Sequence, residues 1–388
     1  METYTAISAL CPDCHRHVPS YYQRRGSQVV LHRCCPNHGP FDAVVSSDVS
    51  YFDQCVEKHS HRSRSRPGLI VELLDGCNIQ CATCIASSSP ALHNLRRPAD
   101  LAAGLVRAAR DSDCCALLLS GGEPTIHPDF LGFIELSETL PDIEHRIVIS
   151  NGIRFADDQR FVGEFAQSMQ RSWQVFLQFD SLNAAVLEDI RGQDLRETRL
   201  QALRRLADVG IPSTLICVVK RGVNLTEVGP LIEFAMNQPF VVGIQFQPIR
   251  NAGRIGNYNA ADNSCDLALT RKAILEAGVV PDLLPHPMSP LSVSVARFDR
   301  RNETWNECVR DDEYFYLQSN QSAQEQFQVS IVEYSDVTNW STAKSVSSPL
   351  RMMSEGGASD GVDDYFVNGG PLEQESNEHT PADARAAN

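Results

Sequence analysis

The segment "CNIQCATC", residues 77–84, places Cys77, Cys81 and Cys84 at a C-x3-C-x2-C spacing directly after the apolar run "LIVELLDG". Parallel α/β folds bind their ligands at the carboxyl ends of the strands, so three thiols at this point indicate a metal site. A structural zinc site takes four protein ligands, whereas an iron–sulfur cube held by three thiolates leaves one iron open. Taken alone, the spacing also fits buried core cysteines or a zinc knuckle.

Strand-like apolar runs alternate with helical segments around this loop. Helix-separated strands that are apolar on both faces are typical of a parallel sheet covered by helices, and right-handed crossovers curl such a sheet. The sequence therefore predicts an α/β fold, a partial (β/α)6 barrel over residues 67–250. Its expected strands are 69–74, 115–120, 146–150, 174–179, 214–219 and 242–248.

Three further segments flank the expected barrel. Residues 1–66 are polar and rich in Cys and His, with too few apolar residues for a strong core, so a bound metal is expected to stabilise them. Residues 251–340 are expected to form a C-terminal extension on the substrate side. Residues 341–388 are rich in Ser, Gly and Glu, and we expect a largely disordered acidic tail.

Composition excludes several classes of function. The net charge of −15 and the lack of clustered Lys and Arg argue against a nucleic-acid partner. The apolar runs fall short of the roughly 20 residues that a membrane span requires, and the start of the chain lacks a secretory signal pattern. Thirteen cysteines in a cytoplasmic protein, the expected location, favour metal binding or catalysis over disulfides.

The second expected strand ends in "LSGGEPTIHPDF", residues 119–130. Gly121 and Gly122 permit a close backbone approach to a ligand, and Glu123 supplies an acceptor for an ammonium group. A glycine pair followed by an acid is also common in an ordinary strand-to-helix turn. Together with three cysteines one strand earlier, the pattern favours a ligand site.

This combination resembles the radical S-adenosylmethionine (SAM) superfamily over about residues 67–250. The resemblance implies that Cys77, Cys81 and Cys84 bind a [4Fe–4S] cluster, and that Gly121, Gly122 and Glu123 hold the methionine ammonium of SAM. Further SAM contacts are implied at later strand ends, namely Ser150, Asn151, Gln178, Asp180, Lys220 and Gln245.

The resemblance also implies a reaction and its partners. The reduced cluster would cleave SAM to a 5′-deoxyadenosyl radical, which would take a hydrogen atom from an unactivated carbon of a small-molecule or lipid substrate. An electron donor such as flavodoxin or ferredoxin would reduce the cluster. A water-excluding, strand-lined site is needed while the radical exists.

A second metal site is expected near the amino end. Cys11 and Cys14 form a C-x2-C pair, and Cys35 and His38 form a C-x2-H pair, with twenty residues between the two pairs. This spacing is typical of tetrahedral zinc or rubredoxin-like iron, with free thiols in a polar segment as the alternative. Combined with the barrel motifs, it resembles the branch of tetraether lipid synthase and the methanopterin-pathway radical SAM methylase.

The resemblance to that branch is incomplete in the C-terminal third. Met288 and Ser289 stand where relatives carry a cysteine for an additional cluster, so such a cluster and the exact reaction do not transfer. His286 fits a ligand or substrate contact but is more typical of a structural histidine. Arg196, Arg199, Arg204 and Arg205 predict a solvated basic helix face, and Cys114, Cys115 and Cys217 predict core packing.

The function expected from these residues is a radical SAM enzyme for C-methylation or carbon–carbon coupling on a lipid, cofactor or secondary metabolite. The alternatives are a peptide-modifying or activating enzyme of the same superfamily and a non-catalytic iron–sulfur or zinc redox scaffold. Cys77, Cys81, Cys84 and Glu123 together favour an enzyme, because a scaffold needs neither an open iron nor an ammonium acceptor.

Overall fold

The fold is described from a computed structural model. The described residues are 3–11, 13–14, 16–60, 68–111, 114–171, 173–249, 253–286, 293–306, 325–333 and 350–353. Several residues singled out in the sequence lie outside them: Met288, Ser289 and most of 341–388. No helix in the described ranges combines the length and the apolar character needed to cross a membrane.

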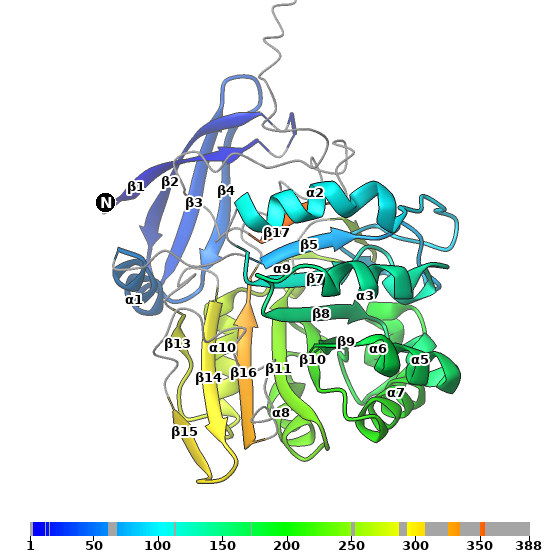
Figure 1. Ribbon diagram of the computed structural model, residues 1–388. Coiled ribbons are helices and arrows are strands. Elements are labelled where there is room, and N and C mark those ends of the chain that lie inside the picture. The colour runs from blue at the N-terminus through cyan, green and yellow to red at the C-terminus, as the bar shows by residue number, and fades with distance from the viewer. Residues whose placement is uncertain are drawn as a thin grey trace, which may run out of the picture.

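The amino-terminal segment folds as a four-stranded antiparallel sheet in the order β1-β2-β3-β4 (Figure 1). The chain reverses between β2 and β3 through Gly26 and Ser27, and Gly26 has the positive φ of 62° that tight hairpin turns require. These elements are β1 (Thr3–Leu10), β2 (His17–Arg25), β3 (Gln28–Cys35), β4 (Gly39–Ser46) and the following helix α1 (Val49–Ser60).

The second sheet contains the six parallel strands that the sequence predicts, and they are neighbours in chain order. The expected α/β fold with a parallel barrel sheet is thereby confirmed. The strands are β5 (Gly68–Glu72), β7 (Ala116–Ser120), β8 (His145–Ser150), β9 (Trp173–Gln178), β10 (Ser213–Val219) and β11 (Val241–Pro248).

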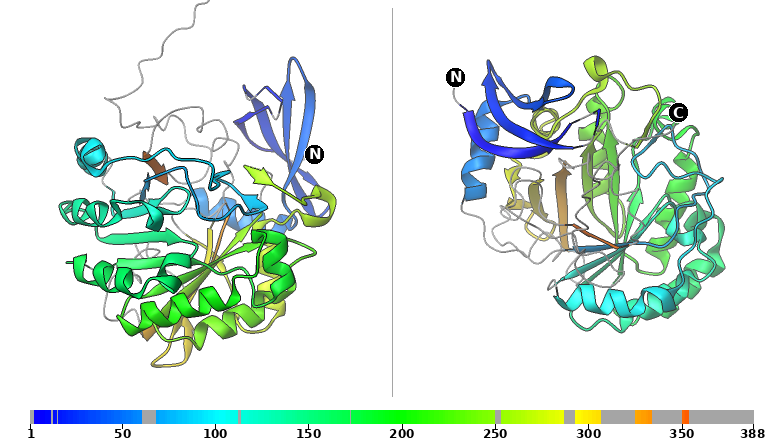
Figure 2. Two further views of the ribbon diagram at one scale, coloured as in Figure 1. Left: turned by 90° about the vertical axis from the view of Figure 1, so that its right-hand side faces the viewer. Right: turned by 90° about the horizontal axis from the view of Figure 1, so that it is seen from above.

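Helices cover the outer face of this curved sheet (Figure 2). Alternate strand residues such as Val175 and Leu177 pack against them in one large core, whereas Phe176 lies in a smaller apolar cluster on the inner face. The helices are α2 (Pro98–Asp111), η1 (Pro124–Ile126), α3 (Phe130–Glu138), α4 (Ile153–Asp157), α5 (Gln159–Ser168), α6 (Ala184–Arg191), α7 (Arg196–Asp208), η2 (Leu225–Glu227) and α8 (Val228–Met236).

The C-terminal extension continues the barrel sheet. β16 (Gln326–Val332) pairs parallel to β11, and β14 (Val293–Asp299) pairs antiparallel to β16. The remaining elements are β12 (Arg254–Ile255), α9 (Ala260–Asn263), α10 (Leu267–Glu276), β13 (Leu284–Pro285) and β15 (Thr304–Asn306).

One strand comes from the segment expected to be a disordered tail. β17 (Leu350–Met353) pairs antiparallel with β5 and so adds a strand at that edge of the barrel sheet. These four residues form a strand, and the rest of 341–388 lies outside the described residues, so the expectation of a largely disordered tail stays a prediction. A strand edge offers unpaired backbone groups, and their pairing compensates for ordering a short segment.

The amino-terminal unit rests on the far end of the barrel sheet through α1 and β4 (Figure 1). The Tyr51 hydroxyl hydrogen-bonds Ser294 on β14, and the guanidinium of Arg271 lies 4.3 Å from the Tyr51 ring centroid. Ser47 donates to Asp266 at 3.0 Å. These contacts join the two expected units into one body.

A truncation tests the pairing of β17 with β5. A chain ending at residue 340 loses the strand and should unfold at a temperature lower by about 2–8 °C, because the ladder is worth a few kcal/mol at most. A chain ending at residue 360 keeps β17 and serves as the control. Equal melting temperatures of the two chains, measured by circular dichroism, would show that β17 does not stabilise the barrel.

Candidate functional site

The three-cysteine loop follows β5 at the carboxyl edge of the parallel sheet. Cys77 and Cys81 are buried, and Cys84, in the short strand β6 (Thr83–Cys84), is half-buried. The three side chains belong to one apolar cluster with Ile79 and Leu195. The structure therefore brings together the thiols that the sequence singled out, at the expected end of the barrel.

The glycine pair after β7 locks onto the start of the cysteine loop. The Gly122 N–H donates to the Leu74 carbonyl at 2.8 Å, and the Glu123 N–H donates to the Gly76 carbonyl at 3.0 Å. A Cβ atom on Gly122 would stand only 1.9 Å from the Gly76 oxygen. Any side chain there would force the two loops apart, so this close approach requires glycine.

The carboxylate of Glu123 joins two strand ends. Its Oε1 accepts hydrogen bonds from the Thr125 N–H at 3.2 Å, the Thr125 hydroxyl at 2.5 Å and the Ser150 hydroxyl at 2.8 Å. Its Oε2 accepts from the Asn151 N–H at 2.7 Å. The side chain is 1% exposed, and burial raises its pKa. Glu123 thus fixes the ends of β7 and β8 relative to each other.

Two side chains donate N–H groups toward the cysteine sulfurs. Asn151 Nδ2 lies 3.8 Å from the Sγ of Cys77, and Arg191 Nη1 lies 3.9 Å from the Sγ of Cys81. Burial raises the pKa of the Cys77 thiol to about 12, and the negative charges of Glu123 and Cys81 act in the same direction. A metal must therefore displace the Cys77 proton when it binds.

A buried ion-pair network stands behind Cys81. Arg191 donates to both carboxylate oxygens of Asp180 at 2.6 and 2.7 Å, and Arg199 donates to one of them at 3.1 Å. Burial acts to raise the pKa of Asp180, but the charges of Arg191 and Arg199 outweigh it and lower the pKa to about 2. The network fixes α6 and α7 to the end of β9.

The network around Asp180 corrects the expected position of Arg199 and includes Arg191, which the sequence analysis did not select. Arg199 was expected on a solvated basic face, yet its side chain is 0% exposed, because it turns inward to neutralise Asp180. Arg196 does lie at the surface, paired with Asp194. Arg191 was not singled out in the sequence. The charged pattern "EDIRGQD" resembles an ordinary exposed helix end, and only the fold shows that this arginine is buried.

Of the other expected SAM contacts, Gln178 and Lys220 lie at strand ends, whereas Gln245 lies within β11. Lys220 is 1% exposed and donates to Asp189 and to the Asn257 carbonyl, at 2.7 and 2.8 Å. Gln178 Oε1 is buried with no hydrogen-bond partner among the described residues. Gln245 is buried, and its register neighbour on β10 is Ile216 of the inner apolar cluster.

His286 and the three cysteines expected in the core are buried. Burial and the nearby charge of Arg297 lower the pKa of His286 to about 4, so its ring is neutral at pH 7. Cys114, Cys115 and Cys217 are buried as expected, and burial raises the pKa of Cys217 well above its ordinary value. The raised pKa agrees with a packing role for Cys217.

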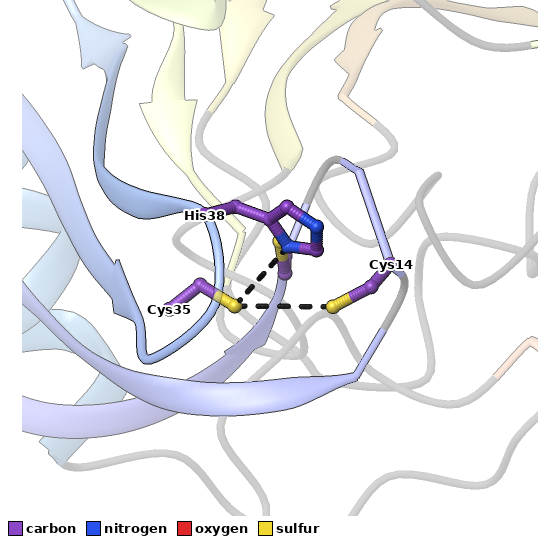
Figure 3. Close-up of side chains that lie close together, drawn as sticks. Cys14, Cys35 and His38 are labelled. Carbon is purple, nitrogen blue, oxygen red and sulfur yellow. Dashed lines mark hydrogen bonds between the residues drawn. The ribbon is translucent and has the colours of Figure 1, made fainter.

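The amino-terminal donor set gathers as the sequence predicts (Figure 3). Donor atoms of Cys11, Cys14, Cys35 and His38 all lie within 4.8 Å of one another. The Nδ1 of His38 lies 3.5 Å from the sulfurs of Cys11 and Cys35, and the sulfurs of Cys14 and Cys35 are 3.8 Å apart. A tetrahedron with zinc–sulfur bonds of about 2.3 Å has edges of about 3.8 Å, so the set fits one tetrahedral ion.

The barrel cysteines have a different geometry. Among the described residues, the amino-terminal set alone gathers closely enough to hold a single ion. Cys77, Cys81 and Cys84 share one loop and one cluster without meeting that condition. In an iron–sulfur cube each thiolate binds a different iron, so three thiols that hold a cube need not gather around one ion.

Comparison with known families also separates the amino-terminal segment from the barrel. Residues 71–235 match the Radical SAM superfamily, and residues 3–47 match the HMPTM N-terminal zinc ribbon domain. Residues 71–235 are thus similar to the radical SAM superfamily, which agrees with the sequence motifs. The two specific branches named above, tetraether lipid synthase and the methanopterin-pathway methylase, are not shown by these matches.

Among curated proteins the chain is similar to GTP 3′,8-cyclases. It is 26% identical to that of Synechococcus elongatus over 189 residues, which are 47% of this chain and 55% of the relative. It is 28% identical to that of Nautilia profundicola over 174 residues, 43% of this chain and 52% of the relative. The chain thus spans about half the length of the curated relatives it matches.

The chain is also similar to two solved structures. The FeFe-hydrogenase maturase HydG from Carboxydothermus hydrogenoformans gives a TM-score of 0.43 at 16% identity, covering 58% of this chain and 54% of that one. A radical SAM methyltransferase from Sphaerobacter thermophilus gives a TM-score of 0.40 at 14% identity. The match covers 68% of this chain and 76% of the methyltransferase.

Substitution of Asp180 tests the buried network. Asp180→Asn leaves two buried guanidinium groups without their counter-charge and should lower the unfolding free energy by about 3–5 kcal/mol. Asp194→Asn, which removes an exposed partner of Arg196, is the control and should leave the unfolding free energy nearly unchanged, because exposed ion pairs are screened by solvent. The measurement is urea unfolding, and equal midpoints for the two variants would contradict the assigned role.

Proposed function

We propose that this chain is a radical SAM enzyme that removes hydrogen from an unactivated carbon atom. The observation that carries the proposal is the joint placement of three thiols and the Gly-Gly-Glu loop at one edge of the barrel, held together by direct backbone hydrogen bonds. A redox scaffold needs no such loop against its cysteines. The match of residues 71–235 supports the proposal.

In this proposal Cys77, Cys81 and Cys84 would hold a [4Fe–4S] cluster by three thiolates. When bound, the cluster and SAM supply a one-electron cleavage that yields a carbon radical able to take a hydrogen atom. The N–H groups of Asn151 and Arg191 would stabilise the thiolates, because hydrogen bonds to sulfur lower the energy of its charged form.

The residues expected to contact SAM divide into two groups. The carboxylates of Glu123 and Asp180 and the Lys220 ammonium already bond protein groups, so we assign them to positioning the strand ends. Gln178 offers a buried carbonyl oxygen without a partner among the described residues, and so it has an acceptor available for a ligand N–H or O–H.

The inner face of the barrel would protect a radical. Below the site it carries aliphatic and aromatic side chains that exclude water from the strand interior. These buried residues come from β5, β7, β8, β9 and β10, namely Ile70, Leu118, Ile147, Phe176 and Ile216. Water would then be kept away from the radical.

We further propose C-methylation or carbon–carbon coupling on a small molecule or lipid as the reaction. The GTP 3′,8-cyclases that the chain is similar to are named for a reaction on a nucleotide, which favours a small-molecule substrate. An electron donor such as flavodoxin or ferredoxin is required by the one-electron chemistry. The need to keep thirteen cysteines reduced favours a cytoplasmic location.

For the amino-terminal site we propose a structural zinc ion. Three thiolates and one imidazole complete a tetrahedron without an open position, as in structural zinc sites, and residues 3–47 match a zinc ribbon domain. Burial acts to raise the pKa of Cys35, but hydrogen bonds from the Asn37 and His38 backbone help lower it to about 6. Cys35 therefore offers a thiolate near neutral pH.

The cluster assignment is tested by replacing one ligand. Anaerobically reconstituted Cys81→Ala should lose most of the barrel iron and should form no 5′-deoxyadenosine from SAM, because two thiolates cannot hold the cluster. Cys34→Ala, an exposed thiol outside both donor sets, is the control. Iron is measured by colorimetric assay and 5′-deoxyadenosine by chromatography. SAM cleavage by Cys81→Ala at the wild-type rate would refute the assignment.

The zinc assignment makes a separate prediction. The double variant Cys11→Ala, Cys14→Ala should lose one zinc per chain and become protease-sensitive within residues 3–47, since a structural zinc contributes on the order of 10 kcal/mol to folding. The iron content of the barrel should persist. Elemental analysis and limited proteolysis measure both effects, and unchanged zinc in the variant would exclude this site.

A further inference from the structure

A short strand far along the chain pairs with the cysteine loop itself. β12 follows β11 and runs antiparallel to β6, with Arg254 opposite Cys84 and Ile255 opposite Thr83. The Gly256 N–H donates to the Ala82 carbonyl at 2.7 Å. Two backbone segments about 170 residues apart in sequence thus form a two-stranded ribbon at a cysteine that the proposed function assigns to the cluster.

Gly253 allows this pairing at very close range. Its φ is +67°, and a Cβ atom there would stand 2.4 Å from the Cys84 carbonyl oxygen and 2.3 Å from that of Ile85. Both the backbone conformation and the space require glycine at this position. The segment "GRIG" at 253–256 can therefore pack closely against the cysteine loop.

The Arg254 side chain holds the same loop at three points. Its Nε donates to the Cys81 carbonyl at 2.7 Å, its Nη2 to the Ser88 carbonyl at 2.7 Å and its Nη1 to the Ser87 carbonyl at 3.4 Å. The accepting groups lie on both sides of Cys84. A planar guanidinium can bond several carbonyls at once, which the single ammonium of lysine cannot reproduce.

The segment that carries Arg254 is anchored to the barrel by a buried lysine. The Lys220 ammonium donates to the Asn257 carbonyl at 2.8 Å and to Asp189 at 2.7 Å. Lys220 is 1% exposed and follows β10 directly. Residues 253–257 are therefore held at both ends, by the cysteine loop and by the barrel edge.

We propose that Arg254 is a positioning residue for the iron–sulfur cluster, which it serves by fixing the backbone that carries Cys81 and Cys84. The inference rests on the proposed function, since it assumes that these thiols bind the cluster. The Gly121–Glu123 loop bonds the Gly76 carbonyl, directly before Cys77. The three ligands would then be fixed by two independent contacts, one from β7 and one from the segment after β11.

The first test follows the loop backbone and needs no cluster. Hydrogen exchange is measured by mass spectrometry on wild type, Arg254→Met and Arg254→Lys, with Arg97→Met as control, because Arg97 is exposed and pairs only locally with Asp100. Amides of residues 82–88 should exchange roughly 10- to 100-fold faster in Arg254→Met, as expected when charge-assisted hydrogen bonds are lost. Arg254→Lys should fall between wild type and Arg254→Met.

The second test uses the reconstituted protein. Arg254→Met should release iron to a ferrous chelator at least about tenfold faster than wild type, and the electron paramagnetic resonance signal of its reduced cluster should broaden. Ethylguanidine added to Arg254→Met should partly restore the slow release, which a general loss of stability would not show. Arg97→Met should match wild type.

The outcomes separate this inference from the proposed function. If wild type binds no cluster, the proposed function fails, while the exchange data still decide whether Arg254 fixes the loop. Suppose that wild type binds its cluster and that both Arg254 variants equal it in amide exchange rate, iron release rate and electron paramagnetic resonance spectrum. The role of Arg254 is then wrong, while the proposed function stands. If Arg254→Met does not fold, an Arg254→Lys variant equal to wild type would overturn the inference, because charge alone would then suffice.

Discussion

The rest of the site depends on one backbone contact, the direct docking of the Gly121–Gly122–Glu123 loop on the end of β5. Two hydrogen bonds of 2.8 and 3.0 Å join it to Leu74 and Gly76, at a separation that admits no side chain. The contact sets where the cysteine loop begins. It also places Glu123 so that its carboxylate can bond the end of β8. Three successive strand ends are thereby held as one rigid edge.

Three buried acidic or basic side chains at this edge, Asp180, Lys220 and Glu123, all bond protein groups. Asp180 bonds two arginines, Lys220 bonds Asp189, and the Glu123 carboxylate accepts four hydrogen bonds from protein groups. Such networks fix side chains within a narrow range of positions, as a site needs when its cofactor must be held still. Several polar residues that resemble ligand contacts in the sequence therefore serve first to orient their neighbours.

The sequence predicts the six barrel strands, the three-thiol loop and the amino-terminal donor set because each depends on local pattern and spacing. It does not predict β17 or the Arg254 contacts, because these pair segments that are distant in the chain and short. Arg199 was assigned to the surface because its helix carries four arginines, and only the position of Asp180 on the neighbouring strand end turns it inward. Local composition cannot show which arginine meets a buried acid.

The central claim is that three thiolates bind a cluster whose remaining iron is open to SAM. Electron–nuclear double resonance on the reduced, reconstituted protein with SAM labelled by ¹⁵N at its amino group tests it most directly. The account predicts a nitrogen coupling to the cluster that appears with labelled SAM and is absent from Cys81→Ala. A four-iron cluster without any coupling to the SAM nitrogen would contradict the claim.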